Sequence, residues 1–330
     1  MTLKSFVRLA AHTQLLPVLE SGEETLVGGQ AVIEGVMMRA PHSYCVAVRK
    51  PNGELVTEES PLPRVSEKYP IFKLPVFRGV GTLGQAMWLG VKALKFSANA
   101  SLDEDSPEAK KNAGKPQEIP GWLMALNLLF SFSFFIFLYK FVPLYLTTLL
   151  EKVYPALHGR IAFNLVDGGI RMAIFLGFLY MISRWQDIRR VFEYHGAEHK
   201  VVFNFESRKP VTVENAQAFT TLHPRCGTSF LLVVMAVSTL VYTVIPVDGF
   251  AAKMASRVVL LPVIAGLSYE LIRFAAKRRG GLLAALTAPG LWLQKITTQP
   301  PSDGQTEVAI HALNGAMALE EKQGGELVIA

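Results

Sequence analysis

A run of 18 residues, Thr228 to Ile245, carries no charged side chain. A helix of about 20 apolar residues spans the core of a bilayer, and such a run is rare inside a soluble domain. Three further apolar blocks follow residue 120: Gly121 to about Leu138, extending toward Leu150; Ile161 to Ile182; and about Ala255 to Ala276. The sequence therefore predicts a mainly α-helical, polytopic membrane protein with about four transmembrane helices. The alternative is a set of buried core helices in a soluble protein.

The composition excludes two other classes of protein. Half of the 330 residues are hydrophobic and 18% are charged, whereas disordered chains are poor in apolar residues and rich in charge. Only two cysteines, Cys45 and Cys226, are present, which excludes a disulfide scaffold. Because the apolar residues crowd into four blocks, the length does not divide into two globular domains.

Lysine and arginine are distributed unevenly around these blocks. Residues 1–120 carry 14 of them, 184–226 carry 7 and 277–330 carry 5, whereas the connections 151–160 and 246–256 carry 2 and 1. Basic residues favour the cytoplasmic side. The three longer segments carry 26 lysine and arginine residues and the two short connections carry 3, which predicts cytoplasmic termini and a cytoplasmic central loop in the cell (inner) membrane. The net charge of +6 then reflects a basic inner face that attracts anionic membrane lipids, and nucleic-acid binding is not predicted.

Composition shifts divide the chain into five regions. They are an N-terminal amphipathic segment without the features of a cleavable signal (1–26), a small cytoplasmic α+β region (27–100), a flexible linker (101–120), a four-helix transmembrane region (121–276) whose central loop is 184–227, and cytoplasmic interfacial and C-terminal helices (277–330).

Within residues 27–100, a strand-like run from Tyr44 to Arg49 precedes a turn signal at Pro51-Asn52-Gly53, after which residues 54–57 can return as a second strand. From Arg78 to Ala98, apolar residues recur at helical spacing, which predicts an amphipathic helix against the membrane surface. The residues expected on its apolar face are Leu83, Met87, Val91, Leu94 and Ala98.

Two apolar segments follow the fourth span. Leu282 to Ile296 is interrupted by Pro289 and Gly290, so we expect it at the membrane interface. Residues 304–322 predict a terminal helix whose inward residues are Val308, Leu313, Ala316 and Leu319.

The strongest chemical signal is the pentapeptide His195-Gly196-Ala197-Glu198-His199. On a helix, His195 and His199 lie one turn apart on the same face, with Glu198 beside them. This is the H-x-x-E-H order of one class of zinc peptidase. Two imidazoles can hold a divalent metal, most readily zinc, while the carboxylate takes a proton from bound water as the catalytic base. The alternative is a pair of histidines that hydrogen-bond around a polar helix face.

A second cluster, His223-Pro224-Arg225-Cys226, follows in the same predicted loop. His223 and Cys226 are both zinc-type ligands and can meet the first pair if the loop folds back. Three ligands would leave a position for water, whereas all four would close the site around a structural metal. Cys226 could equally be a small buried residue at the start of the third span.

The stretch from Gly28 to Arg39 carries glycines spaced for close backbone approach, and one acid and one base on an apolar run. It lacks the strand-to-helix frame of a dinucleotide-binding fingerprint. Candidate substrate-binding residues are Glu34, Arg39, His42 and Arg225. The alternative is a buried turn with an internal Glu–Arg pair.

Two ionisable residues, Asp167 and Arg171, fall inside the second predicted span. Their i,i+4 spacing allows an intramembrane ion pair, which lowers the cost of burying each charge. Such groups can also mark a transport pathway, which an oligomer could complete, but no inverted repeat is evident.

Several motifs together resemble a family of uncharacterised bacterial multi-pass membrane proteins that are catalogued as metal-dependent enzymes. The matching stretches are GGQAVIEGVMMR (28–39), PVFRGV (75–80), YHGAEHK (194–200), HPRCGTSF (223–230) and QTEVAIHAL (305–313). The resemblance spans most of residues 27–320. The resemblance implies a bound metal. It also implies that the functional positions are His195, Glu198, His199, His223 and Cys226, which are the residues that the two motifs already indicate.

Three functions are therefore expected. The first is a membrane enzyme with a zinc-type site that hydrolyses a peptide or lipid substrate at the cytoplasmic face. The second is a non-catalytic membrane adaptor or scaffold with a structural metal, which recruits partners through its basic face. The third, a transporter using Asp167 and Arg171, is the least favoured.

Overall fold

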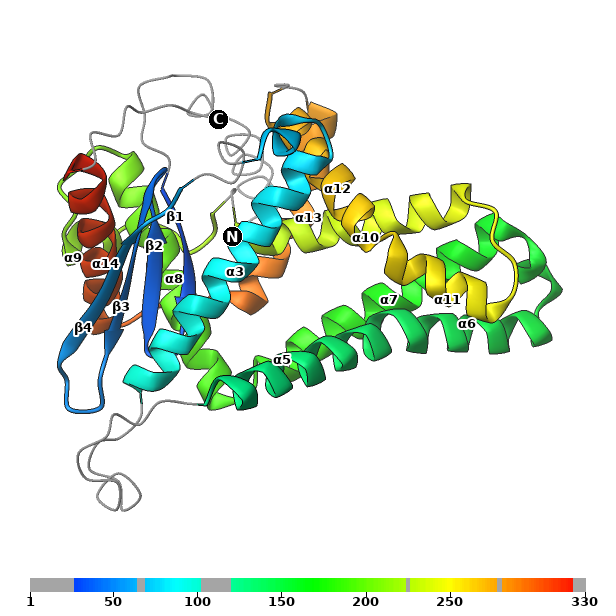
Figure 1. Ribbon diagram of the computed structural model, residues 1–330, viewed down its shortest axis with the longest axis horizontal. Helices are drawn as coiled ribbons and strands as arrows, with labels where there is room; N and C mark the ends of the chain where they lie inside the picture. Colours follow the sequence, from blue (N-terminus) through cyan, green and yellow to red (C-terminus); the bar gives the residue numbers. More distant parts are fainter. Residues whose placement is uncertain (1–26, 64–68, 102–119, 224–225, 278–280, 323–330) are drawn as a thin grey trace, which may run out of the picture.

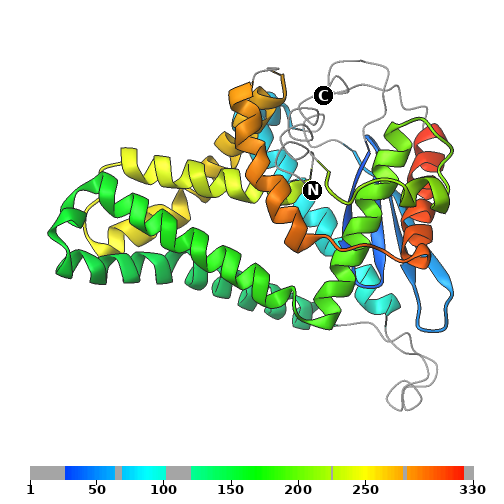
Figure 2. The same ribbon diagram turned by 180° about the vertical axis from the view of Figure 1, so that it is seen from behind.

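A computed structural model describes residues 27–63, 69–101, 120–223, 226–277 and 281–322 (Figure 1). The expected amphipathic segment 1–26, most of the linker 101–120 and the candidate Arg225 lie outside these residues. The chain is mainly helical with one small antiparallel sheet. The sheet and its covering helices lie at one end of the molecule, and an elongated group of helices extends away from them in both views (Figures 1 and 2).

The sheet has four antiparallel strands in the order β1-β2-β3-β4. They are β1 (Gly28–Val32), β2 (Gly35–Arg39), β3 (Ser43–Arg49) and β4 (Leu55–Pro61). The expected hairpin corresponds to β3 and β4, whereas β1 and β2 were not expected as strands. They pair through a two-residue turn at Ile33 and Glu34, with Val32 opposite Gly35.

Helices cover both faces of this sheet. Cys45 and Ala47 of β3 pack against α8 (Gln186–Glu206) and α14 (Asp303–Lys322), whereas the alternating residues Tyr44, Val46 and Val48 pack against α3 (Phe77–Ala100). Because both faces of β3 are buried, the strand is a nearly continuous apolar run, which is why the sequence signals it so clearly. The result is a three-layer α/β/α unit, with the small helix α9 (Val213–Gln217) against α8 and α14.

Helix α3 matches the expected helix in extent. Leu89 and Ala93 are buried against the sheet, whereas Met87 and Leu94, expected on the apolar face toward the membrane surface, are exposed, Met87 to 68%. The apolar stripe is wide, and the sheet covers a different part of it. Met87, Trp88 and Leu94 therefore remain on an outer face.

The elongated part contains the apolar helices. Helix α5 (Gly121–Ile136) continues through a π-helical turn, η3 (Phe137–Phe141), into α6 (Val142–Val153), and α7 (Arg160–Ile182) and α10 (Gly227–Val244) follow as single helices. The short 3-10 turn η4 (Pro155–His158) joins α6 to α7, and another, η2 (Pro70–Lys73), precedes α3. Helices α11 (Phe250–Val259) and α12 (Leu261–Lys277) are bent by 52°.

Three of these helices are long and apolar enough to cross a membrane, or four if the bent pair forms one span. Exposed side chains on α5 include Trp122, Leu129 and Phe130. A face of this kind suits a lipid environment better than water. The fold therefore matches the expected class of mainly helical protein with about four candidate spans.

The last two helices return the chain to the sheet. Helix α13 (Gly281–Thr297) contains Pro289 and packs on α10; its expected place at the membrane interface stays a prediction. A Cβ at Gly290 would meet the Ser229 side chain at 2.2 Å, so this glycine allows the close approach of the two helices. In α14, Val308, Leu313 and Ala316 are buried as expected, and Leu319 is half-buried.

Candidate metal centre

The predicted central loop 184–227 is largely helical. Helix α8 passes through the H-x-x-E-H motif without a break, because its apolar face is buried against the sheet and α14. Gly196 causes no bend: a Cβ there would meet the carbonyl oxygen of Gln299 at 2.1 Å. This glycine therefore lets the segment after α13 lie directly on the motif.

Backbone carbonyls hold both histidines of the motif. His195 Nδ1 lies 2.8 Å from the Thr297 carbonyl oxygen, and His199 Nδ1 lies 2.5 Å from that of Thr221. A carbonyl oxygen only accepts hydrogen bonds, so each Nδ1 is the donor, and in the neutral imidazole each Nε2 is then the atom that keeps a lone pair. Metal-binding histidines are commonly oriented in this way.

Cys226 completes a group of three ligand atoms. It is the residue before α10, and its Sγ lies 3.3 Å from His195 Nε2. One ligand atom from each of His195, His199 and Cys226 lies within 4.8 Å of the others. Zinc binds imidazole nitrogen at about 2.0–2.1 Å and thiolate sulfur at about 2.3 Å, so the spacing and chemistry of this group fit one ion.

Glu198 lies beside the three ligand atoms. Its Oε2 is 3.9 Å from Nε2 of both His195 and His199, and its side chain is buried. A Cβ on Gly29 of β1 would meet Glu198 Cγ at 2.7 Å. The expected close backbone approach in the 28–39 stretch is therefore the approach of Gly29 to this carboxylate.

His223 lies in the same place but outside the group of three ligand atoms. Its ring centroid is 5.5 Å from that of His199, and its Nε2 lies 3.6 Å from Glu206. Burial lowers the pKa of His223 to about 4, so its imidazole is neutral at pH 7. Two hydrogen bonds of 2.7 Å fix its position: the His223 amide donates to Gln294 Oε1, and Gln294 Nε2 donates to the His223 carbonyl oxygen.

These side chains share one cavity of about 350 Å³. Its lining includes Gly28, Gly29 and Arg39 from the sheet, together with His195, Glu198, His199, His223 and Cys226. The two motif clusters therefore meet in space, and Arg39 faces the same cavity. Of the four proposed ligands, three form the compact group, which leaves space for water or a substrate beside them.

Two of the candidate substrate-binding residues lie elsewhere, which corrects the expectation. Glu34 lies at the turn of the β1–β2 hairpin and accepts two hydrogen bonds of 2.5 Å from Arg190. Glu34 therefore does not line the cavity, and its partner is Arg190 rather than Arg39. His42 Nδ1 lies 2.8 Å from a carboxylate oxygen of Glu320 on α14. Both residues join the sheet to a covering helix.

Several residues of the site were not expected from the sequence. Thr221 and Thr297 contribute only backbone oxygen atoms, which leave no trace in the residue pattern. Gln294 is fully buried in an apolar helix. A polar residue in such a segment is a sequence feature that could have indicated its role in the site.

The fold and the site together define a class: a helical protein with three or four candidate spans and a small sheet domain that holds a histidine–cysteine cavity. Within that class, the chain belongs to the family described as "Protein of unknown function (DUF1385)", which matches residues 74–319. It is 36% identical over 299 residues to "Uncharacterized protein YqhQ" of Bacillus subtilis (strain 168), covering 89% of this chain and 92% of the relative. No solved structure matches. The expectation of an uncharacterised bacterial family is thus confirmed, and neither the family description nor the name of the relative mentions a metal or a reaction.

Proposed function

We propose that this protein is a metal-dependent, zinc-type hydrolase of the cell membrane. The observation that carries the proposal is the meeting of His195, His199 and Cys226 beside a buried carboxylate, Glu198, in one cavity. Three protein ligands with space for water are typical of catalytic zinc sites, whereas structural sites are usually closed by four.

The side chains would divide the chemistry between them. His195 and His199 would bind the metal through Nε2, and Cys226 through its thiolate. The metal would supply Lewis acidity and a bound water of lowered pKa. Glu198, 3.9 Å from both Nε2 atoms, would take the proton of that water as general base. Arg39 on the cavity wall would attract an anionic part of the substrate.

The proposed location is the cytoplasmic face of the membrane. Most lysine and arginine residues belong to the sheet end of the chain and few to the far helix connections, as the positive-inside rule requires. A cavity close to the bundle suits a substrate at the membrane, either a peptide or a lipid, and membrane lipids would surround the apolar helices.

Glu198→Gln tests the proposal. The purified, zinc-loaded chain is assayed with a fluorogenic peptide and a fluorogenic phospholipid ester. We expect Glu198→Gln to keep its zinc and to lose turnover by about 100-fold or more. Glu193→Gln, on the same helix but bonded to Gln305, is the matched control and should behave like the natural chain. Unchanged turnover in Glu198→Gln would refute the base assignment.

One observation favours a second candidate, an adaptor with a structural metal. The ligand group joins α8 to the start of α10, so a bound ion would cross-link the sheet domain to the bundle. An adaptor of this kind predicts that a chelator lowers the unfolding temperature strongly while the chain shows no turnover. The enzyme predicts loss of turnover on chelation.

A further inference from the structure

A second polar centre lies inside the helical bundle, away from the sheet. Asp167 of α7 is paired with Arg171 of the same helix and accepts a hydrogen bond of 2.6 Å from Arg257 of α11. The expected Asp167–Arg171 pair therefore forms, and a second arginine joins it. All three side chains are buried.

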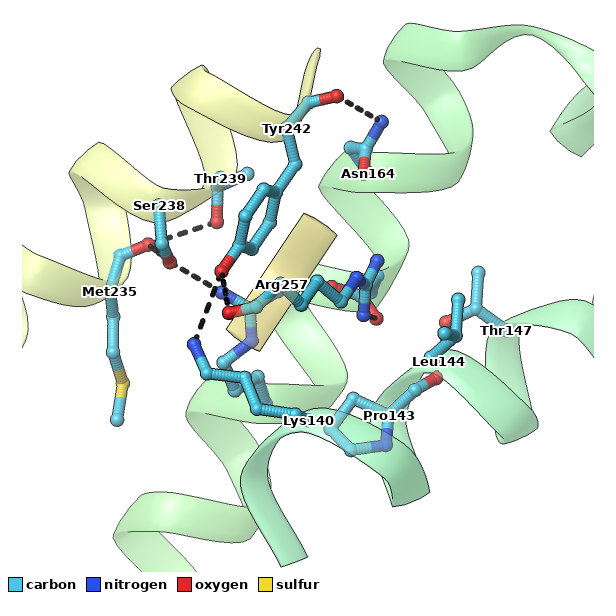
Figure 3. A network of polar contacts seen from close by, with 12 residues as sticks. Lys140, Pro143, Leu144, Thr147, Asn164, Met235, Ser238, Thr239, Tyr242 and Arg257 are labelled. Carbon is cyan, nitrogen blue, oxygen red and sulfur yellow. Dashed lines mark hydrogen bonds and ion pairs between the residues drawn. The ribbon is translucent and has the colours of Figure 1, made fainter. Parts of the chain in front are cut away.

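Lys140 brings a third cation to this centre. It lies in the π-helical turn η3, where Pro143 lacks the N–H that would bond the carbonyl of Tyr139 in a regular helix. The Lys140 ammonium donates to the Tyr242 hydroxyl at 3.3 Å (Figure 3). Lys140, Arg171 and Arg257 lie 5.6, 5.3 and 5.2 Å from the centroid of the Tyr242 ring. We call Lys140, Asp167, Arg171, Tyr242 and Arg257 the cationic cluster.

The charges of the cationic cluster do not balance. Two arginines and a lysine face one carboxylate, so the described side chains leave a net positive charge in a buried region. Buried charge is costly unless it is paired. Within the described residues, Arg171 Nε is also buried without a hydrogen-bond acceptor. Among the described residues, both facts favour an anionic partner for the cluster.

A cavity of about 270 Å³ leads to the cluster from the end of the bundle opposite the sheet. Arg257, Tyr242 and Asn164 form its inner wall, and Arg160, Lys253 and His158 lie farther out. Glu151 and Asp248 also line it and balance Arg160 and Lys253, so the positive excess lies at the inner end, where Arg257 is backed by Lys140 and Arg171. The cavity therefore combines an opening with a positive potential at its inner end.

We infer that this cavity is a binding site for a phosphate-class oxyanion, held by Arg257 and Lys253 and attracted by the net charge of the cationic cluster. Its volume lies at the lower limit of about 300 Å³ for ligand pockets, which suits a small anion or a headgroup rather than a large substrate. Arginine recognises phosphate oxygens through its planar donors, and lysine does so as a point charge. The site is separate from the metal centre and does not depend on it. The anion can come from free phosphate or from a phospholipid headgroup.

Binding to the full-length, detergent-purified chain tests this inference. Inorganic phosphate is titrated by calorimetry, and phosphatidylglycerol is added in a parallel arm followed by native mass spectrometry. Lys253→Met removes a cation from the cavity wall. Lys140→Met removes a basic group from the cationic cluster. Because this second change lowers the buried positive charge, the Lys140→Met variant should fold at least as well as the natural chain. Lys152→Met, at an exposed position near the same end, is the matched control.

We expect Lys253→Met and Lys140→Met each to weaken binding by about tenfold or more, equivalent to about 1.4 kcal/mol, and the control to bind like the natural chain. Binding of inorganic phosphate identifies a free anion as the ligand. Binding of phosphatidylglycerol alone, with the same variant pattern, identifies a lipid headgroup. The inference is overturned if neither anion binds, or if Lys140→Met and Lys253→Met bind as well as Lys152→Met.

Discussion

At the scale of single residues, the polarity of two imidazoles decides what the candidate metal centre can do. The carbonyl oxygens of Thr297 and Thr221 fix the protons of His195 and His199 on Nδ1, so both lone pairs face Cys226 and Glu198. These carbonyls come from segments 102 and 22 residues away from the histidines. The site is therefore oriented by tertiary structure before any ion binds, which is a feature of preorganised metal sites.

Gly29 provides a test at this scale. Gly29→Ala places a Cβ 2.7 Å from Glu198 Cγ and 2.7 Å from the Met37 carbonyl oxygen, so either the carboxylate or the strand must move. We expect a loss of about 1–3 kcal/mol in the free energy of unfolding, seen as a lower unfolding temperature. Gly28→Ala, beside it in β1, meets nothing within 4 Å and should change stability by less than about 0.5 kcal/mol. Equal unfolding temperatures for the two variants would contradict this close approach.

At the scale of elements, the C-terminal helix completes the sheet domain. Helix α14 supplies one covering layer, and its last buried residue, Glu320, is bound by the turn between β2 and β3. The His42 amide donates to Glu320 Oε2 at 2.9 Å, and Ser43 Oγ lies 2.7 Å from the same atom. Residues 278 positions apart along the chain thus close the domain.

This contact predicts a pH dependence of stability. Burial alone would raise the pKa of Glu320, but hydrogen bonds from Ser43 and His42 outweigh it and hold the pKa below its ordinary value. A depressed pKa means that the ionised carboxylate stabilises the fold above about pH 4.5, and that this contribution is lost as the pH falls through and below that value. The Glu320→Gln variant should therefore have a lower unfolding temperature than the natural chain at pH 7, and the difference should shrink at about pH 4.

The neighbouring carboxylate supplies the control for this prediction. Glu321 is exposed on the same helix, so Glu321→Gln should show little difference from the natural chain at either pH. A gap between Glu320→Gln and the natural chain that stays constant between pH 7 and pH 4 would show that the carboxylate charge does not stabilise this contact.

At the scale of the whole molecule, the structure separates two chemical environments. The sheet domain holds the candidate metal centre, and the far end of the bundle opens toward the cationic cluster. The continuous helix from Gly121 to Val153 has 33 residues and a length of about 50 Å, longer than the roughly 30 Å bilayer core. One end of this helix therefore extends beyond the lipid in any upright orientation.

The proposed orientation can be tested with single cysteines in whole cells. A membrane-impermeant maleimide should label Lys152→Cys, at the far end of α6, without permeabilisation. Lys209→Cys, just after α8, should be labelled only after permeabilisation, because the sheet domain is proposed to be cytoplasmic. The otherwise natural chain, with Cys45 and Cys226, gives the baseline. The reverse labelling pattern would invert the topology.

The sequence predicts the apolar helices and the chemical motif well, because both are local patterns. The helix that follows Thr228 and the strand that begins near Tyr44 are both evident from the hydrophobicity of neighbouring residues. Strands β1 and β2 were missed because Gly28, Gly29 and Gly35 interrupt their alternation. Contacts such as Arg257 to Asp167, 90 residues apart, and the carbonyls behind the histidines follow from packing and have no local pattern.

The metal content of the purified chain tests whether His195, His199 and Cys226 bind a metal ion. Elemental analysis of the natural chain, the double variant His195→Ala/His199→Ala and the control His311→Ala, an exposed histidine on α14, compares the site with the rest of the molecule. We expect about one zinc per chain in the natural protein and in the control, and loss of that ion in the double variant. Equal metal content in all three proteins would contradict a metal centre at His195, His199 and Cys226.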